Sequence, residues 1–270
     1  MKNIKIKTKS RIASILKADS LDFSITGLPT FNLSELDLTN DLEFQLPTNL
    51  RLGHLAEKIV SELIKSSSNY QVLYENAQVI EDKNTIGEID FIIKNLITKQ
   101  ITHVELAYKF YLFDPSISST PINNWIGPNR NDSLQEKLEK LKRKQFPLLH
   151  HNVAKSIFKN IELDEVSQAL CLLVSLFIPY QYVANFSPIY KKAIKGYYLN
   201  FETFISFDHS TKSYYVPSKN EWGMAPSENE NWTNFNDVEK YISTCIKEKQ
   251  APLCWQKCED SYLVFFIVWW

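Results

Sequence analysis

The sequence predicts an α/β protein in which a mixed central sheet is flanked by helices. Three observations carry this prediction: a helical periodicity over residues 51–65, three strand-like runs between residues 71 and 113, and a continuous apolar run over residues 169–179. The order helix, three strands, helix, strand is typical of an α/β core. The predicted organisation is an N-terminal arm of short helices over residues 1–50, a core over residues 51–182 and a C-terminal α+β extension over residues 183–270.

Composition limits the classes of function. The 270 residues are 44% apolar and 23% charged, an ordinary globular balance that allows a sizeable core. A formal net charge of -1 excludes attraction of nucleic acid by bulk charge, so an anion-binding surface must be local. The six glycines form neither GxGxxG nor GxxxxGK[ST], which excludes a glycine-rich phosphate loop.

The apolar segments are short. The basic start, MKNIKIKTKSRIASILK, lacks the continuous apolar stretch of a secretory signal. The longest apolar runs, ALCLLVSLFIPY and YLVFFIVWW, fall short of the roughly 20 residues that span a bilayer. We therefore expect a soluble cytoplasmic protein with no membrane partner.

The four cysteines predict reduced thiols. Cys171 lies inside an apolar run and is expected to be a small core residue. Cys245, Cys254 and Cys258 follow the spacing C-x8-C-x3-C, which contains no CxxC pair. Structural thiols are the default for these three, with a metal or iron–sulfur cluster as the alternative.

The first helix of the core is predicted over RLGHLAEKIVSELIK, residues 51–65, and the polar SSSN ends it. Apolar residues recur there at i, i+3, i+4, i+7, i+8, i+11 and i+12, the period of an amphipathic helix. They are Leu52, Leu55, Ala56, Ile59, Val60, Leu63 and Ile64.

Three strands follow, over QVLYENAQVI, GEIDFIIKN and THVELAYKFYLF. The short link LITKQ predicts an antiparallel hairpin between the second and the third. A loop rich in Pro, Ser, Asn and Gly, DPSISSTPINNWIGPNRN, comes next. Because side chains alternate along a strand, THVELAYKFYLF has one apolar and one mixed face. The mixed face holds His103, Glu105, Ala107, Lys109 and Tyr111, and the apolar face holds Val104, Leu106, Tyr108, Phe110 and Leu112.

The second helix is expected to begin at Asp132 as its N-cap, with Gln135 completing a capping box. Its apolar stripe is Leu134, Leu138 and Leu141. The run ALCLLVSLFIP then predicts a strand buried on both faces. Beyond about residue 183 we expect aromatic-rich strands, a helix over NDVEKYISTCIKEKQ and a final strand.

Two carboxylates are expected to face each other across the hairpin. Asp90 and Glu105 fall on one face, and two carboxylates held close together repel each other unless a cation neutralises them. Hard oxygen ligands of this kind suit Mg²⁺ or Mn²⁺. Lys109 projects to the same face, where it could orient an attacking water or a phosphate oxygen, and Glu57 on the first helix offers a further carboxylate. The alternative is that all four are solvated charges.

These motifs resemble the PD-(D/E)XK nuclease superfamily with its αβββαβ core, and more closely the bacterial family of domain of unknown function 1853. The motifs that carry the resemblance are Arg51–Gly53 with Glu57, Gly87–Phe91, Glu105–Leu112, Trp125–Asn129, and Asp132 through Gln145. The resemblance implies a restriction-endonuclease-like core in which Asp90 is the central metal ligand, Glu105 the second and Glu57 the helical acid.

The sequence departs from the superfamily pattern at one position. The usual lysine stands two residues after the second acid, where this chain has Ala107. Lys109 stands one pleat further on, about 6.5–7 Å along the strand. The resemblance thus implies Lys109 as the catalytic lysine, provided that its side chain reaches back.

Other side chains are expected near the site. Lys137, Lys140 and Lys144 at i, i+3 and i+7, with Lys142 and Arg143 adjoining, predict a basic stripe that binds nucleic-acid phosphates. The alternative is a solvated helix face that pairs with Glu136 and Glu139. Glu88 shares the Asp90 face, His103 the Glu105 face, and Trp125, Asn129 and Asp132 either fold over the site or form a structural turn.

The leading hypothesis is a Mg²⁺- or Mn²⁺-dependent nuclease that hydrolyses phosphodiester bonds of DNA or RNA. Its main rival is a catalytically degenerate protein of the same fold that binds nucleic acid or a protein partner, which the displaced lysine favours. A hydrolase for another phosphate compound is a third class, since fold does not fix substrate.

Overall fold

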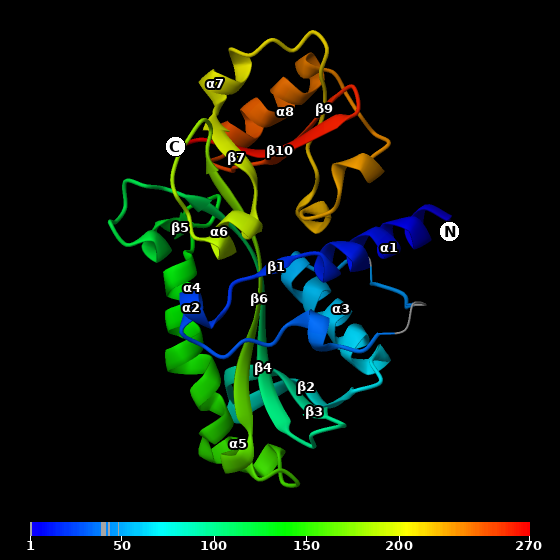
Figure 1. The fold of residues 1–270 in the computed structure, drawn as a ribbon, viewed down its shortest axis with the longest axis vertical. Coiled ribbons are helices and arrows are strands. Elements are labelled where there is room, and N and C mark those ends of the chain that lie inside the picture. The colour runs from blue at the N-terminus through cyan, green and yellow to red at the C-terminus, as the bar shows by residue number, and fades with distance from the viewer. Residues whose placement is uncertain (1, 39–41, 43, 48) are drawn as a thin grey trace. The chain divides into compact units, whose positions relative to one another are not determined.

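Helices and strands alternate along the chain, and the strands form a mixed, central sheet flanked by helices (Figure 1). The computed structural model describes residues 2–38, 42, 44–47 and 49–270. The chain divides into two compact units, each built from several segments. Unit 1 comprises Met1–Asp19, Lys109–Gln135 and Val174–Trp270, and unit 2 comprises Ser20–Tyr108 and Glu136–Leu173.

Unit 2 holds the first elements of the predicted core in the predicted order. They are α3 (Leu52–Ser66), β2 (Tyr70–Glu81), β3 (Asn84–Asn95) and the first part of β4 (Ile101–Phe113). β2 pairs antiparallel with β3, and β3 pairs antiparallel with β4, so the predicted hairpin is confirmed. Asp82 and Lys83 connect β2 to β3 with φ values of 47° and 66°, the left-handed pair that a tight type I′ hairpin requires.

The second helix of the core is not a regular α-helix throughout. α4 (Leu134–Lys140) continues into a π-helical turn, η3 (Leu141–Gln145), and then into a 3₁₀ segment, η4 (Phe146–His150). The expected N-cap at Asp132 is wrong, because the helix begins at Leu134 and the Asp132 carboxylate accepts a hydrogen bond from Lys109 instead. α5 (Asn152–Ile157) and η5 (Leu163–Glu165) complete this part of the chain.

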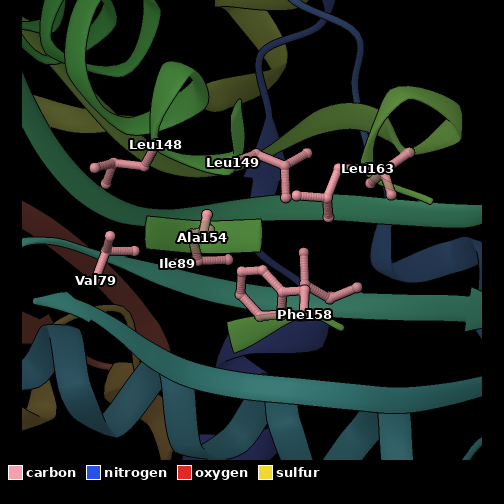
Figure 2. Packing of buried hydrophobic residues seen from close by; sticks show 9 residues of the cluster. Val79, Ile89, Leu148, Leu149, Ala154, Phe158 and Leu163 are labelled. Carbon is pink, nitrogen blue, oxygen red and sulfur yellow. The ribbon is translucent and has the colours of Figure 1, made fainter. Parts of the chain in front are cut away.

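The segment from α4 to η4, the helical run, packs on β2 and β3 through an apolar cluster of unit 2. Figure 2 shows Leu148, Leu149 and Leu163 beside Val79 and Ile89 of the strands, with Ala154 and Phe158 of the α5 region. A Cβ at Gly87 would lie 2.2 Å from Cδ1 of the Leu148 side chain. The glycine of the GEIDF motif therefore leaves room for the Leu148 side chain of η4 against β3.

β6 (Ser167–Pro179) is the strand that the run ALCLLVSLFIP predicts, and residues 169–177 are all buried, which confirms burial on both faces. It neighbours β4 in the sheet. The Thr102 and Ser167 hydroxyl oxygens lie 2.9 Å apart, so both strands start side by side and run in the same direction. The first part of β6 belongs to unit 2 and its end, from Val174, to unit 1.

The N-terminal segment contains α1 (Lys2–Leu16), β1 (Asp19–Ser20), α2 (Phe23–Thr26) and the 3₁₀ segment η1 (Leu33–Glu35). α2 and η1 are the short helices expected there, whereas α1 has 15 residues. The predicted arm also includes residues 1, 39–41, 43 and 48, which lie outside the described residues. The division at residues 50 and 182 stays a prediction.

Unit 1 is built on a second set of strands, in the order β6-β7-β10-β9-β8. β7 pairs parallel with β6 and with β10, whereas β9 pairs antiparallel with β10 and with β8. The remaining elements are β5 (Trp125–Ile126), α6 (Pro188–Ala193), β7 (Ile194–Asn200), α7 (Phe201–Ile205), β8 (Ser213–Tyr215), α8 (Phe235–Lys247), β9 (Leu253–Cys258), β10 (Ser261–Val268) and the 3₁₀ segments η2 (Pro121–Asn124), η6 (Lys219–Glu221) and η7 (Pro226–Glu228). The expected helix and final strand are thus present.

The described residues hold no disulfide, and all four cysteines are free thiols, with Cys171, Cys245 and Cys254 buried. Within the same part of the chain, no helix combines the length and the apolarity needed to cross a membrane.

Candidate functional site

The hairpin brings Asp90 and Glu105 together. Phe91 pairs with Val104 and Ile92 with His103, so the antiparallel register, continued by one residue, sets Asp90 opposite Glu105. The ladder of paired residues stops at Phe91 and Val104, and beyond it Asp90 Oδ2 accepts a hydrogen bond of 2.8 Å from the backbone N–H of Leu106. The predicted juxtaposition of the two carboxylates is therefore what the strand register produces.

Electrostatics at Asp90 favour its protonated form. Burial raises the pKa of Asp90 to about 8, and the negative charges of Glu105 and Glu57 add to this effect. The Leu106 N–H and the Lys137 charge act in the opposite direction, with a smaller result. Without a cation, the site thus keeps a proton at neutral pH on a carboxyl that would be ionised in water.

Glu105 is only 1% exposed, yet each of its oxygens has a hydrogen-bond partner. Oε1 lies 2.9 Å from Nε2 of His103, and Oε2 accepts a hydrogen bond of 3.1 Å from Nε2 of Gln145. Gln145 also donates to the backbone carbonyl of Glu88 at 3.3 Å. Neighbours from β4 itself and from the helical run therefore fix the carboxylate plane.

The π-helical turn explains why Gln145 reaches Glu105. In an uninterrupted α-helix, the residue seven after Lys137 would share its face, and that residue is Lys144. A π turn closes its hydrogen bonds at i→i+5 rather than i→i+4 and so holds about one residue more. The insertion moves Lys144 off this face and brings Gln145 to its place.

The same turn interrupts the predicted basic stripe. Lys137 is part-buried, and its charge acts on Asp90, whereas Lys140, Lys142, Arg143 and Lys144 are exposed. The Arg143 guanidinium pairs with Glu139 at 2.8 Å, as the solvated alternative expects. The exposed cations still follow one another along the helical run, and their contact with nucleic acid stays a prediction.

Glu57 completes the acidic group from α3. Its side chain is 23% exposed, and Oε2 lies 3.0 Å from Nδ1 of His54. Its effect on the pKa of Asp90 shows that its charge is felt at the hairpin. The described residues contain no group of three or more His, Cys, Asp or Glu side chains placed to hold a metal ion.

The donor set nevertheless suits a hard cation. Asp90 and Glu105 offer carboxylate oxygens, the ligands that Mg²⁺ and Mn²⁺ prefer, and Mg²⁺ commonly takes one or two carboxylates with water completing the shell. Burial raises the pKa of Asp90 most and the Glu105 charge raises it further, so a cation beside the two carboxylates would favour the ionised form of Asp90. Two protein carboxylates with Glu57 nearby therefore fit Mg²⁺ or Mn²⁺ by their chemistry.

Lys109 forms an ion pair with Asp132. Its Nζ lies 2.7 Å from Oδ2 of Asp132, and both residues belong to unit 1. Asp90, Glu105 and Glu57 belong to unit 2. The contact of Lys109 that the structure describes is thus an ion pair with the acid that the sequence predicts as a helix cap.

The WIGPN segment forms a structural turn within unit 1. Trp125 is fully buried, and Asn129 Oδ1 accepts a hydrogen bond of 2.8 Å from the backbone N–H of Ala251. The Pro128 carbonyl accepts another, of 3.1 Å, from Nε1 of Trp270. Of the two alternatives for this motif, its contacts are those of the structural turn.

The sequence predicts no role for two residues that contact the site, Gln145 and Gln168. Gln145 is the last residue of the motif that begins at Asp132, but it was assigned no role. Gln168 lies 3.2 Å from His103 and carries no sequence signal beyond its place at the start of the β6 run. His103, expected on the Glu105 face, contacts Glu105 directly.

The comparisons with known proteins give one match. The family model described as domain of unknown function (DUF1853) matches residues 12–263. No curated protein and no solved structure matches the chain at a significant level. Because the matched region covers well over half of the chain and contains both the hairpin and the helical run of the site, the chain belongs to the DUF1853 family.

Proposed function

We propose that Asp90 and Glu105, with Glu57 beside them, form a Mg²⁺ or Mn²⁺ site that hydrolyses phosphodiester bonds of nucleic acid. The observation that carries the proposal is the position of a part-buried Asp90 opposite a second, buried carboxylate, an arrangement that raises the pKa of Asp90. Concentrated negative charge of this kind favours a cation, and perturbed carboxyl groups gather at functional sites. The order of α3, β2, β3, β4, α4 and β6 agrees with an αβββαβ core.

Each residue has a distinct task in this proposal. Asp90 and Glu105 would hold the ion, and Glu57 would approach it from α3. When bound, such an ion polarises a phosphate oxygen and lowers the pKa of a bound water. Gln145 keeps Glu105 oriented, and the exposed cations of the helical run, Lys140, Arg143 and Lys144, would bind the phosphates of the substrate.

Cleavage assays with one isosteric variant test the proposal. We expect the full chain with Mg²⁺ or Mn²⁺ to cleave at least one of a panel of single- and double-stranded DNA and RNA substrates. Asp90→Asn keeps the shape but removes the charge, so cleavage should fall to the background rate. Asp82→Asn, in the β2–β3 turn where asparagine suits the left-handed backbone, is the control and should keep full activity. Equal rates for wild type and Asp90→Asn on every substrate would contradict the catalytic role.

A second candidate is a catalytically degenerate member of the same fold that binds nucleic acid or a protein partner. It is favoured by the ion pair of Lys109 with Asp132, which engages the only lysine that the superfamily resemblance places on the site strand. Calorimetry with Mg²⁺ and Mn²⁺ separates the candidates, because a degenerate site should bind neither ion whereas the proposed centre should bind both.

A further inference from the structure

His103 is a buried histidine that the proposed chemistry leaves without a task. It is 0% exposed at the start of β4, and Phe146 contacts its ring edge-on with centroids 5.4 Å apart. Nε2 lies 2.9 Å from Glu105 Oε1, and Nδ1 lies 3.2 Å from Nε2 of Gln168. Both ring nitrogens are therefore engaged, one by the candidate metal ligand and the other by a side chain of β6.

The Phe146 carbonyl decides which ring nitrogen carries the proton. Gln168 Nε2 lies 2.7 Å from this oxygen, which can only accept a hydrogen bond, so the amide nitrogen must face it. The second hydrogen of the same NH₂ group then points to Nδ1 of His103, which must accept it. The imidazole is thus neutral with its hydrogen on Nε2, and it donates that hydrogen to Glu105 Oε1.

Glu105 is held at both ends by this arrangement. His103 donates to Oε1 and Gln145 to Oε2, so rotation of the carboxylate would break both hydrogen bonds. A carboxylate has about four lone-pair sites, and two are filled here. Each oxygen keeps one direction for a further partner, so Glu105 can still reach a cation while both hydrogen bonds hold it.

We propose that His103 and Gln168 are positioning residues that orient Glu105 as a ligand for a small, hard cation. The cation part rests on the proposed function, whereas the orientation of Glu105 does not. Partners of this kind, one step removed from the ion, fix ligand geometry in many metal sites.

The first experiment needs no metal. ¹⁵N NMR of the histidines in the full, metal-free chain should show the His103 proton on Nε2. In Gln168→Leu the hydrogen bond to Nδ1 is lost, so the ¹⁵N shift of Nδ1 should move toward that of an unbonded acceptor while the proton stays on Nε2. A proton on Nδ1 in the wild type, or an unchanged Nδ1 shift in Gln168→Leu, would overturn the inference.

The second experiment measures Mn²⁺ affinity by calorimetry. His103→Leu and Gln168→Leu should each weaken binding by roughly 10- to 100-fold. His103→Gln, whose amide N–H can replace Nε2–H, should recover part of the loss, and the exposed His150→Gln should bind as the wild type does. Circular dichroism shows whether each variant is folded, and a variant that fails to fold leaves the decision to the NMR of the wild type.

The outcomes separate the two proposals. Equal Mn²⁺ affinity in wild type, His103→Leu and Gln168→Leu would overturn the positioning role while the metal site stands. Absence of Mn²⁺ binding in the wild type, together with the expected tautomer, would contradict the proposed function and still support the orientation of Glu105 by His103.

Discussion

At the scale of single residues, Asp90 is held in a chemical state that an exposed aspartate would not adopt. Burial on β3 raises the pKa of Asp90 most, and the charges of Glu105 and Glu57 raise it further. The single N–H of Leu106 offsets only part of this. The chain therefore tolerates a cost at Asp90 that a purely structural role does not require, since a neutral asparagine would fit the same volume.

This cost predicts how stability depends on pH. The folded-state pKa of Asp90, about 8, lies above the unfolded value of about 3.9. The folded state thus binds the proton more tightly between these values, so the Asp90 contribution to the free energy of unfolding falls as pH rises through this window. Asp90→Asn should remove the fall and be the more stable protein at pH 8, by several kcal/mol at about 1.4 kcal/mol per pKa unit.

Urea unfolding of both proteins without divalent ions, at about pH 4.5, 6 and 8, checks the prediction. The gap between the two free energies of unfolding should widen steadily with pH. A gap of constant size would mean that Asp90 titrates normally. Added Mn²⁺ should restore stability at pH 8 in the wild type alone.

Residues differ in how far the sequence could predict their place. Asp90 and Glu105 were predictable, because strand alternation and a short hairpin link decide which side chains share a face. Gln145 and Gln168 were not, because their reach depends on a π turn and on the neighbourhood of β4 and β6, which no local pattern encodes. The engagement of Lys109 by Asp132 also arises from folding of the loop between them.

At the scale of elements, the helical run from α4 to η4 combines two roles. One side presents Gln145 to the hairpin, and the other carries exposed cations. Helical periodicity predicted that a helix stands here, but not the π turn, because an inserted residue in a helix leaves the local composition unchanged. The strands of unit 2 were easier to predict, because the alternation of their side chains and the turn residues between them indicate the same strands.

The exposed cations make a prediction about salt. If they bind phosphates, Lys140→Gln/Lys144→Gln should weaken nucleic-acid binding and lower the slope of log K against log salt by up to about 2. Lys240→Gln/Lys247→Gln on α8 changes the net charge equally and should leave the slope unchanged. Fluorescence anisotropy with a labelled oligonucleotide at several salt concentrations measures both. Equal slopes for the two variants would assign the helix face to solvent.

At the scale of the whole molecule, the chain passes repeatedly from one unit to the other. It does so at residues 19/20, 108/109, 135/136 and 173/174, which makes four passages. β4 and β6 each begin in unit 2 and end in unit 1. The end of β6 finds its partner in unit 1, where Leu176–Pro179 pairs with β7.

These passages predict that the core of residues 51–182 does not fold alone. Cutting after residue 182 removes β7 and leaves the apolar end of β6 with an open edge, which favours aggregation. We expect the fragment to be insoluble or to lack a cooperative thermal transition by circular dichroism, whereas the full chain should unfold cooperatively. A fragment with a sharp transition near that of the full chain would establish residues 51–182 as a domain.

The repeated passage between units also bears on inheritance. No unbroken stretch of gene carries one complete unit alone, because the shortest stretch that holds all of unit 2, residues 20–173, also carries Lys109–Gln135 of unit 1. The family region, residues 12–263, accordingly takes in all four passages. We expect insertions and fusions in related genes to fall outside this stretch or in its surface loops, and the acidic hairpin to be passed on only together with the aromatic-rich strands that follow it.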